Sequence, residues 1–194
     1  AAMIAYGAAR YALARGSKSE AEELWPLIEW CLEYCRRKLT PQGVVASDTD
    51  ELEGRFPAGE ANLCTSTLYY DALRSAVYLG RELKRPAARL RQYAHQADRL
   101  AEAIDRHFGA TVAGYETYRY FDGCTKLRSW ICMPLIAGLK NRSRGTVSAL
   151  LGKELMTPDG LLTEQGSSTF WDRSTLYALR GIYIAGEADR ATDF

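Results

Sequence analysis

Histidine and paired cysteine motifs are scarce in this sequence, and their scarcity argues against the common metal-binding modules. The 194 residues contain two histidines, His95 and His107, and five cysteines without any Cys-x-x-Cys spacing. Because structural zinc sites take Cys and His ligands at such spacings, we expect no metal site and no cofactor. Cys31 and Cys35 fall on the apolar stripe of one predicted helix, where free cysteine packs as a small hydrophobe.

Long apolar runs and one-signed charge clusters are also missing. No stretch approaches the roughly 20 apolar residues that span a bilayer, and the first residues lack the charged region and cleavage site of a signal peptide. The 25 basic and 24 acidic residues are interspersed, so no basic stripe is available for the phosphates of a nucleic acid. We expect neither a membrane nor a nucleic-acid partner. The missing export signal favours the cytoplasm, and the oligomeric state is left open.

The remaining pattern, 47% apolar and 25% charged, predicts helices of two alternating kinds. Helices with one apolar stripe are expected at residues 19–38, 86–108 and 144–155. Helices that are apolar on most faces, which is typical of buried helices, are expected at residues 3–14, 62–80, 129–139 and 174–186. Five glycines in the apolar helices cost helix propensity, and we attribute them to close helix packing: Gly7, Gly80, Gly138, Gly181 and Gly186.

This alternation predicts an all-α fold, a toroid of helical hairpins. A hairpin with an apolar inner helix cannot bury that helix alone and has to stack on its neighbours. The chain supplies about half of the hairpins of a closed (α/α)6 barrel. Both of its ends interrupt helical patterns, so we expect residues 1–194 to form a single domain that is a fragment of such a barrel.

Long connections alternate with short ones between the predicted helices. The long ones, residues 40–61, 109–127 and 156–173, each precede an inner helix. Alternate connections of antiparallel helices lie at the same end, so we expect these loops to form one rim that carries the functional site. The acidic residues near position 50 would then be neighbours of residues 171–173.

The loop 40–61 contains the densest group of acidic side chains of the predicted rim, beside Arg55 and Phe56. The acidic residues are Asp48, Asp50, Glu51, Glu53 and Glu60. Glycoside hydrolysis requires one carboxylic acid that protonates the leaving oxygen and a second carboxylate that activates water or attacks the sugar. The alternatives are that these acids cap the following helix or belong to a solvated loop. The spacing does not match the calcium loop of an EF-hand.

Aromatic side chains characterise the loop 109–127. Its alternation of residues from Tyr115 to Asp122 predicts a small β-hairpin that turns at Asp122 and Gly123. These aromatic residues could border a sugar or pack against the end of the barrel.

The loop 156–173 brings Glu164 and the triplet Trp171, Asp172 and Arg173 to the start of an inner helix, and Trp130 lies at the start of another. Tryptophan can stack on a sugar ring, while Asp and Arg bind hydroxyl groups. Core packing of each tryptophan and an ion pair between Asp172 and Arg173 are the structural alternatives.

Two segments resemble the six-hairpin glycosidase superfamily, which includes trehalases, glucoamylases, processing α-glucosidases and α-L-rhamnosidases. They are DTDELEGRFPAGEANLCTSTLYYDALRSA and DGLLTEQGSSTFWDRSTLYALRGIYIAG. In trehalases and processing α-glucosidases the general acid is an Asp in a Ser-Gly-x-Asp motif followed by Arg. Asp50, between Ser47 and Arg55, is the nearest counterpart by resemblance, and because the Gly is missing, Asp48 and Glu51 are rivals. The base of those enzymes lies further along the chain, so Glu164 is a substitute candidate.

The resemblance implies a glycoside hydrolase that acts on an oligosaccharide or glycoside, with an inverting mechanism favoured. The candidate catalytic residues are Asp50, Glu51, Asp48 and Glu164, and the candidate substrate-binding residues are Arg55, Phe56, Trp130, Trp171, Asp172 and Arg173. If the true base lies elsewhere, the 194 residues alone are expected to be inactive. The alternatives are a toroid-fold sugar epimerase or polysaccharide lyase, which would move protons through His or Tyr, and a non-catalytic carbohydrate-binding scaffold. The two histidines count against the epimerase.

Overall fold

The computed structural model describes residues 1–47 and 49–193 and divides the chain into two units, Ala1–Ile104 and Asp105–Phe194. The all-α class is confirmed, because the only sheets among the described residues are two short antiparallel hairpins. Within the same residues, no helix is both long enough and apolar enough to cross a membrane. The single domain of residues 1–194 stays a prediction.

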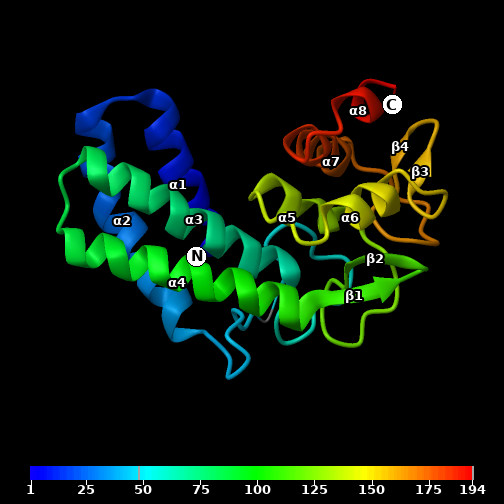
Figure 1. Cartoon of the computed structure of the whole chain (residues 1–194), viewed down its shortest axis with the longest axis horizontal. Helices are drawn as coiled ribbons and strands as arrows, with labels where there is room; N and C mark the ends of the chain where they lie inside the picture. Colours follow the sequence, from blue (N-terminus) through cyan, green and yellow to red (C-terminus); the bar gives the residue numbers. More distant parts are fainter. Residues whose placement is uncertain (48, 194) are drawn as a thin grey trace. The chain divides into compact units, whose positions relative to one another are not determined.

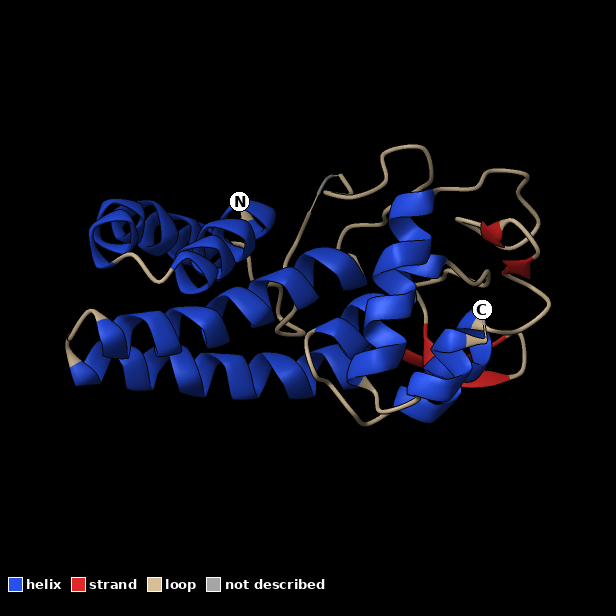
Figure 2. Ribbon diagram, turned by 90° about the horizontal axis from the view of Figure 1, so that it is seen from above, coloured by secondary structure: helices blue, strands red, loops and turns tan. Residues whose placement is uncertain are grey.

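Four helices form the first unit, and all four were predicted to within a few residues. They are α1 (Ala2–Arg15), α2 (Lys18–Arg37), α3 (Leu63–Glu82) and α4 (Ala87–Phe108). Helix α1 packs against α2 and α3, while α3 and α4 run side by side (Figures 1 and 2). Side chains cap two of the helices: Ser17 Oγ accepts a hydrogen bond from Glu20 N at the start of α2, and Asn62 Oδ1 accepts one from Thr65 N at the start of α3.

Helix α3 is the inner helix of this unit. Buried residues lie on every face of it, as the apolar pattern predicted. Its buried Asp71 carboxylate accepts two hydrogen bonds from Arg10 of α1, at 3.0 and 2.5 Å, and one from Ser75 Oγ. Gly80 lets α3 approach its neighbours, because a Cβ there would collide with Leu90 of α4 and Trp25 of α2.

The second unit is built from shorter elements. They are β1 (Gly109–Val112), β2 (Tyr115–Tyr118), the 3-10 helix η1 (Ser129–Cys132), α5 (Met133–Ile136), α6 (Ser143–Leu150), β3 (Met156–Thr157), β4 (Gly160–Leu161), α7 (Asp172–Ile184) and α8 (Ala188–Thr192). Every residue of η1 and α5 is buried, and α7 packs against both. Strand β2 packs against α6, where the hydroxyls of Thr117 and Thr146 form a buried hydrogen bond of 2.8 Å.

The predicted hairpin of the loop 109–127 exists, but its predicted turn is wrong. Strands β1 and β2 turn at Ala113 and Gly114, both of which have positive φ as a type I′ turn requires. The Asp122–Gly123 pair makes a separate turn, closed by a hydrogen bond from Cys124 N to Phe121 O. Strand β2 includes Thr117, which is buried against Thr146 of α6, a contact that local sequence does not reveal.

Two predicted helices are shorter than expected, and one helix was not predicted. The helix expected at 129–139 is a 3-10 turn followed by α5, whose second residue is Pro134, and it stops before Gly138. The helix expected at 144–155 ends at Leu150 and continues as turns. The helix that was not predicted is α8, which follows the apolar pattern of residues 174–186.

Burial also corrects two expectations for the apolar helices. Helices α1 and α7 are only partly buried in the described chain, since Ile4 of α1 and Leu176 of α7 are 50% and 63% exposed. Close packing explains Gly80 and Gly181 but not the other three glycines, because a Cβ at Gly7, Gly138 or Gly186 would meet no atom within 4 Å. Gly138 and Gly186 instead follow helix ends with positive φ.

The cysteines provide a test of the predicted packing. All five are free; Cys31, Cys35, Cys64 and Cys132 are buried, and Cys124 is partly exposed. Burial raises the pKa of Cys35 to about 12 and also raises that of Cys132. We therefore expect a thiol reagent at pH 8 to modify Cys124 quickly in the folded protein and the other four only after denaturation, as counted by mass spectrometry. Fast labelling of Cys35 would contradict the packing of α2.

The pair Arg10–Asp71 is expected to stabilise the first unit. Replacing Asp71→Asn removes the charged acceptor of a bidentate, largely buried hydrogen-bond pair and should lower the free energy of unfolding by about 1–3 kcal/mol in urea denaturation. The control Glu22→Gln breaks an exposed pair with Lys18 at 3.9 Å and should cause no measurable change. Equal effects of the two variants would mean that the Asp71 pair contributes no more than a surface pair.

Candidate functional site

The acidic loop, residues 40–61, is held at both ends by backbone hydrogen bonds. Ala46 N donates to Lys38 O at the end of α2, and Ser47 N donates to Glu60 O just before α3, both at 2.8 Å. Asp48 lies outside the described residues. The loop therefore delivers its acidic side chains directly ahead of the buried helix α3, as the sequence predicted.

Glu51 caps helix α1. Its carboxylate accepts hydrogen bonds from the backbone N–H groups of Ala2 and Met3, at 3.2 and 2.6 Å. These are donors of a first helical turn, which have no partner inside the helix. Asp50 Oδ1 accepts a local hydrogen bond from Leu52 N at 2.9 Å. Glu51 therefore caps α1 and not the following helix α3, whose first turn is capped by Asn62.

Among the acids of the loop that the structure describes, Glu53 is the most deeply buried, with 1% of its surface exposed. Its Oε1 accepts a hydrogen bond from Arg55 N at 3.3 Å and lies 3.9 Å from Arg55 Nε. Its Oε2 is buried without a hydrogen-bond partner among the described residues. Sequence reasoning placed Glu53 in the acidic group but not among the site residues, because one Glu in an acidic run carries no signal of burial.

A cavity of about 400 Å³ adjoins the loop in the first unit. Ser47, Thr49 and Glu51 line it from the loop, and Thr65 lines it from the first turn of α3. The Thr65 Oγ1 and Asn62 Nδ2 atoms are buried, with no partner among the described residues. Buried polar atoms without partners need an explanation, such as an unseen water or a ligand. Arg55 is exposed, Phe56 is half-buried, and neither lines this cavity.

In the second unit, Glu164 forms a buried ion pair with Arg128. Arg128 Nε lies 2.9 Å from Glu164 Oε2, and Lys126 Nζ lies 3.6 Å from Oε1. The Arg128 side chain is 1% exposed and its guanidinium lies over the ring of Tyr120 at 4.7 Å. Arg128 was missed at the sequence level, since one Arg beside an apolar run is most often a surface residue.

The residues around Trp171 form an aromatic cluster with one cation. The Arg173 guanidinium lies 4.6 Å from the Trp171 ring centre and 5.4 Å from that of Trp130, and Tyr177 meets Trp130 edge to face at 5.8 Å. Trp130 is 0% exposed, which favours the core-packing alternative for its ring. Trp171 is half-buried and Arg173 is exposed, so both can reach a ligand.

Asp172 opens helix α7. Its Oδ1 accepts a hydrogen bond from Arg173 N at 2.7 Å, and its side chain is exposed. A carboxylate at this position suits the positive end of the helix dipole.

The structure therefore gathers the candidate residues into two groups, one in each unit. Asp50, Glu51, Arg55 and Phe56 belong to the loop of the first unit, whereas Glu164, Trp130 and residues 171–173 belong to the second. That the two groups share one pocket stays a prediction. Within residues 1–47 and 49–193, no three His, Cys, Asp or Glu side chains are grouped so as to hold a metal ion.

Comparison with known proteins gives a likeness in fold. No family model matches the chain, and no curated protein matches its sequence. A rhamnosidase from Klebsiella oxytoca, solved with rhamnose bound, matches 95% of this chain with a TM-score of 0.70 and 13% identity. A GH78 family rhamnosidase of Bacillus sp. GL1 matches 96% with a TM-score of 0.70 and 16% identity. The chain covers 34% and 20% of these two proteins.

These matches confirm the expected fold, part of a toroid of helical hairpins. At such low identity they carry no residue roles.

The Arg128–Glu164 pair is expected to be essential for the second unit. Glu164→Gln leaves the buried Arg128 guanidinium without its countercharge, which should cost about 3–5 kcal/mol of unfolding free energy. Lys126→Met removes only the exposed partner of Glu164 and should change stability little. If Glu164→Gln unfolds at the same urea concentration as the unmodified protein, the pair is not a structural anchor.

Proposed function

We propose that this chain is part of the catalytic domain of a glycoside hydrolase. The observation that carries the proposal is the fold likeness to two rhamnosidases over nearly the whole chain. The acidic loop ahead of α3 adds the residue type that the reaction requires, since glycosidases work through a pair of carboxyl groups.

Asp50 is the residue that we propose as the general acid. Glu51 is a weaker choice, because its carboxylate already accepts hydrogen bonds from two backbone N–H groups of α1. An acid that protonates a glycosidic oxygen has to direct its proton at the substrate. Asp50 is the nearest counterpart of the acid in the motif, and its Oδ1 accepts a hydrogen bond from Leu52 N. Asp48, as the rival named by the motif, belongs in the same test.

The second carboxylate has to accept a proton from water in an inverting mechanism, which we favour. Glu164 is the substitute candidate of this chain, and its ion pairs with Arg128 and Lys126 engage its oxygens as acceptors. A carboxylate that is paired with cations in this way suits the role of a base better than that of an acid. Trp171 and Arg173 would hold the sugar by stacking and by hydrogen bonds, and Arg55, Phe56 and Asp172 would complete the contacts.

The proposal is tested by turnover of aryl glycosides in the full-length protein, with an aryl α-L-rhamnoside first because rhamnosidases share the fold. Asp50→Asn should lower kcat by about 10²–10⁴-fold, the usual contribution of a general acid, without changing the melting temperature. Glu51→Gln should act mainly on stability, through the cap of α1.

Three outcomes would contradict the proposal. Activity that survives Asp50→Asn, Glu51→Gln and Asp48→Asn would remove the acidic loop from the mechanism. An unsaturated product that absorbs in the ultraviolet would identify a lyase. Binding of oligosaccharides without any product, across the whole panel, would identify a carbohydrate-binding scaffold.

A further inference from the structure

A groove between α2 and α4 lies apart from the acidic loop and from every residue named above as a site candidate. It has a volume of about 720 Å³ and belongs to the first unit. Its walls are the last two turns of α2 with Leu39, and residues 89–99 of α4. A volume of roughly 300–1,000 Å³ is typical of sites for small ligands.

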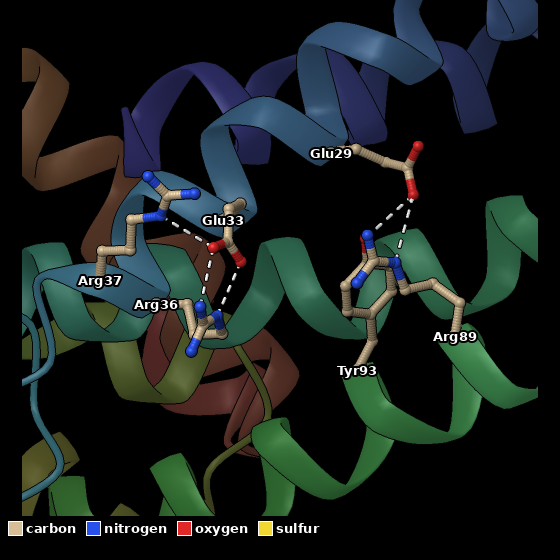
Figure 3. Close-up of polar contacts among 6 residues, drawn as sticks. All are labelled: Glu29, Glu33, Arg36, Arg37, Arg89 and Tyr93. Carbon is tan, nitrogen blue, oxygen red and sulfur yellow. Dashed lines mark hydrogen bonds and ion pairs between the residues drawn. The ribbon is translucent and has the colours of Figure 1, made fainter.

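Polar side chains of α2 and α4 surround this groove. Glu29 of α2 joins the helices at one end, where it accepts a hydrogen bond from Tyr93 Oη at 3.2 Å and lies 3.6 Å from Arg89 Nε (Figure 3). One turn further along α2, Glu33 turns back to its own helix and binds Arg36 and Arg37. Apolar ridges usually close the space between packed helices. Here a stretch of charged and amide groups faces solvent instead.

The lining of the groove is basic. Arg36 and Arg37 contribute from α2, and Arg89 and Arg99 from α4, whereas Glu33 is the only carboxylate among the lining residues that the structure describes. Hydrogen bonds from Arg36 and Arg37 lower the pKa of Glu33 to about 2, so Glu33 holds these two guanidinium groups in place at physiological pH. Counting Glu29 as well, the arginines still outnumber the carboxylates, which favours an anionic ligand.

Amide side chains stand between the arginines of α4. One face of the helix carries Gln92, Gln96 and Arg99, because their spacings of four and three residues match the helical repeat. An amide group both donates and accepts hydrogen bonds, as a sugar hydroxyl does. The combination of guanidinium groups with amides fits a ligand that carries both carboxylate and hydroxyl groups.

The second observation is a buried hydroxyl of α3 that interacts electrostatically with residues of the groove. Tyr69 of α3 is 0% exposed, and its Oη has no hydrogen-bond partner among the described residues. Burial raises its pKa, and the other groups that act on it electrostatically are Cys35, Arg36, Glu33 and Tyr93, three of which line the groove. A buried hydroxyl without a partner is costly, and a molecule held in the groove would satisfy it directly or through a water.

We propose that the α2–α4 groove is a second carbohydrate site, which binds an acidic oligosaccharide of two or three uronate residues. The arginines bind the carboxylates, Gln92 and Gln96 bind hydroxyl groups, and a water links the ligand to the buried Tyr69 hydroxyl. The site is distinct from the acidic loop, so it binds without cleaving.

The test is isothermal titration calorimetry of the full-length protein with trigalacturonate, with neutral maltotriose and inorganic phosphate as comparison ligands. Within residues 1–47 and 49–193, Arg99 makes no ion pair whose loss would disturb the fold. Arg99→Gln should weaken trigalacturonate binding about tenfold, the usual cost of one charged contact. The matched control is Arg91→Gln, which removes the same charge from the same helix but outside the groove, and should leave the affinity unchanged.

The variant Tyr69→Phe tests whether the Tyr69 hydroxyl contributes to ligand binding or to the stability of the fold. It should weaken binding about threefold without lowering the melting temperature, because it removes a polar atom that has no hydrogen-bond partner in the part of the chain that the structure describes. A lower melting temperature with unchanged affinity would overturn the role of Tyr69.

Equal losses in Arg99→Gln and Arg91→Gln would show that only the general charge of α4 attracts the ligand, and would overturn the site. Absence of trigalacturonate binding, or equal binding of maltotriose or of phosphate, would overturn the ligand class. The Asp50→Asn variant should bind trigalacturonate as the unmodified protein does, so the groove and the proposed hydrolase activity succeed or fail separately.

Discussion

Burial of helix α3 on all of its faces is the constraint from which the first unit is built. A helix enclosed in this way can carry polar side chains only where each finds a partner. Asp71 finds Arg10 and Ser75, and Asn62 finds the backbone of the first turn. Two polar atoms of α3 have no partner among the described residues. Thr65 lines the cavity beside the acidic loop, and Tyr69 interacts electrostatically with three residues of the α2–α4 groove. Each of the two candidate sites in the first unit is thus associated with a buried polar group of the inner helix α3.

In the second unit, a buried arginine is the polar group that has to find partners. Arg128 is enclosed by an ion pair with Glu164 on one side and by the rings of Tyr120 and Phe121 on the other. Guanidinium groups are weakly hydrated and planar, so they tolerate burial between a carboxylate and aromatic faces. Arg173 lies over Trp171 and Trp130 in a similar way but remains exposed to solvent. One Arg organises the fold and the other borders the candidate site.

The likeness to rhamnosidases supports a fold more firmly than an activity. A helical toroid is a scaffold that can host different chemistries, and the chemistry depends on which side chains its loops present. The acidic loop of this chain presents three different environments for its acids. Glu51 caps a helix, Asp50 closes a local turn, and Glu53 is buried with one oxygen that has no hydrogen-bond partner among the described residues. These differences follow from backbone geometry and explain why acids a few residues apart are not equivalent candidates.

The sequence alone determined the helix positions in the first unit, the all-α class and the packing of Cys31 and Cys35, because helical periodicity is local and strong in long amphipathic helices. It also located the long loops and most of the candidate residues. The tertiary structure alone decided the turn of the β1–β2 hairpin, the short form of η1 and α5, the cap formed by Glu51 and the burial of Arg128. Each of these depends on a partner far away in the chain: Thr146 for Thr117, the first turn of α1 for Glu51, and Glu164 for Arg128. Local patterns contain no information about such partners, because their energies arise only when packing brings the two segments together and excludes water from between them.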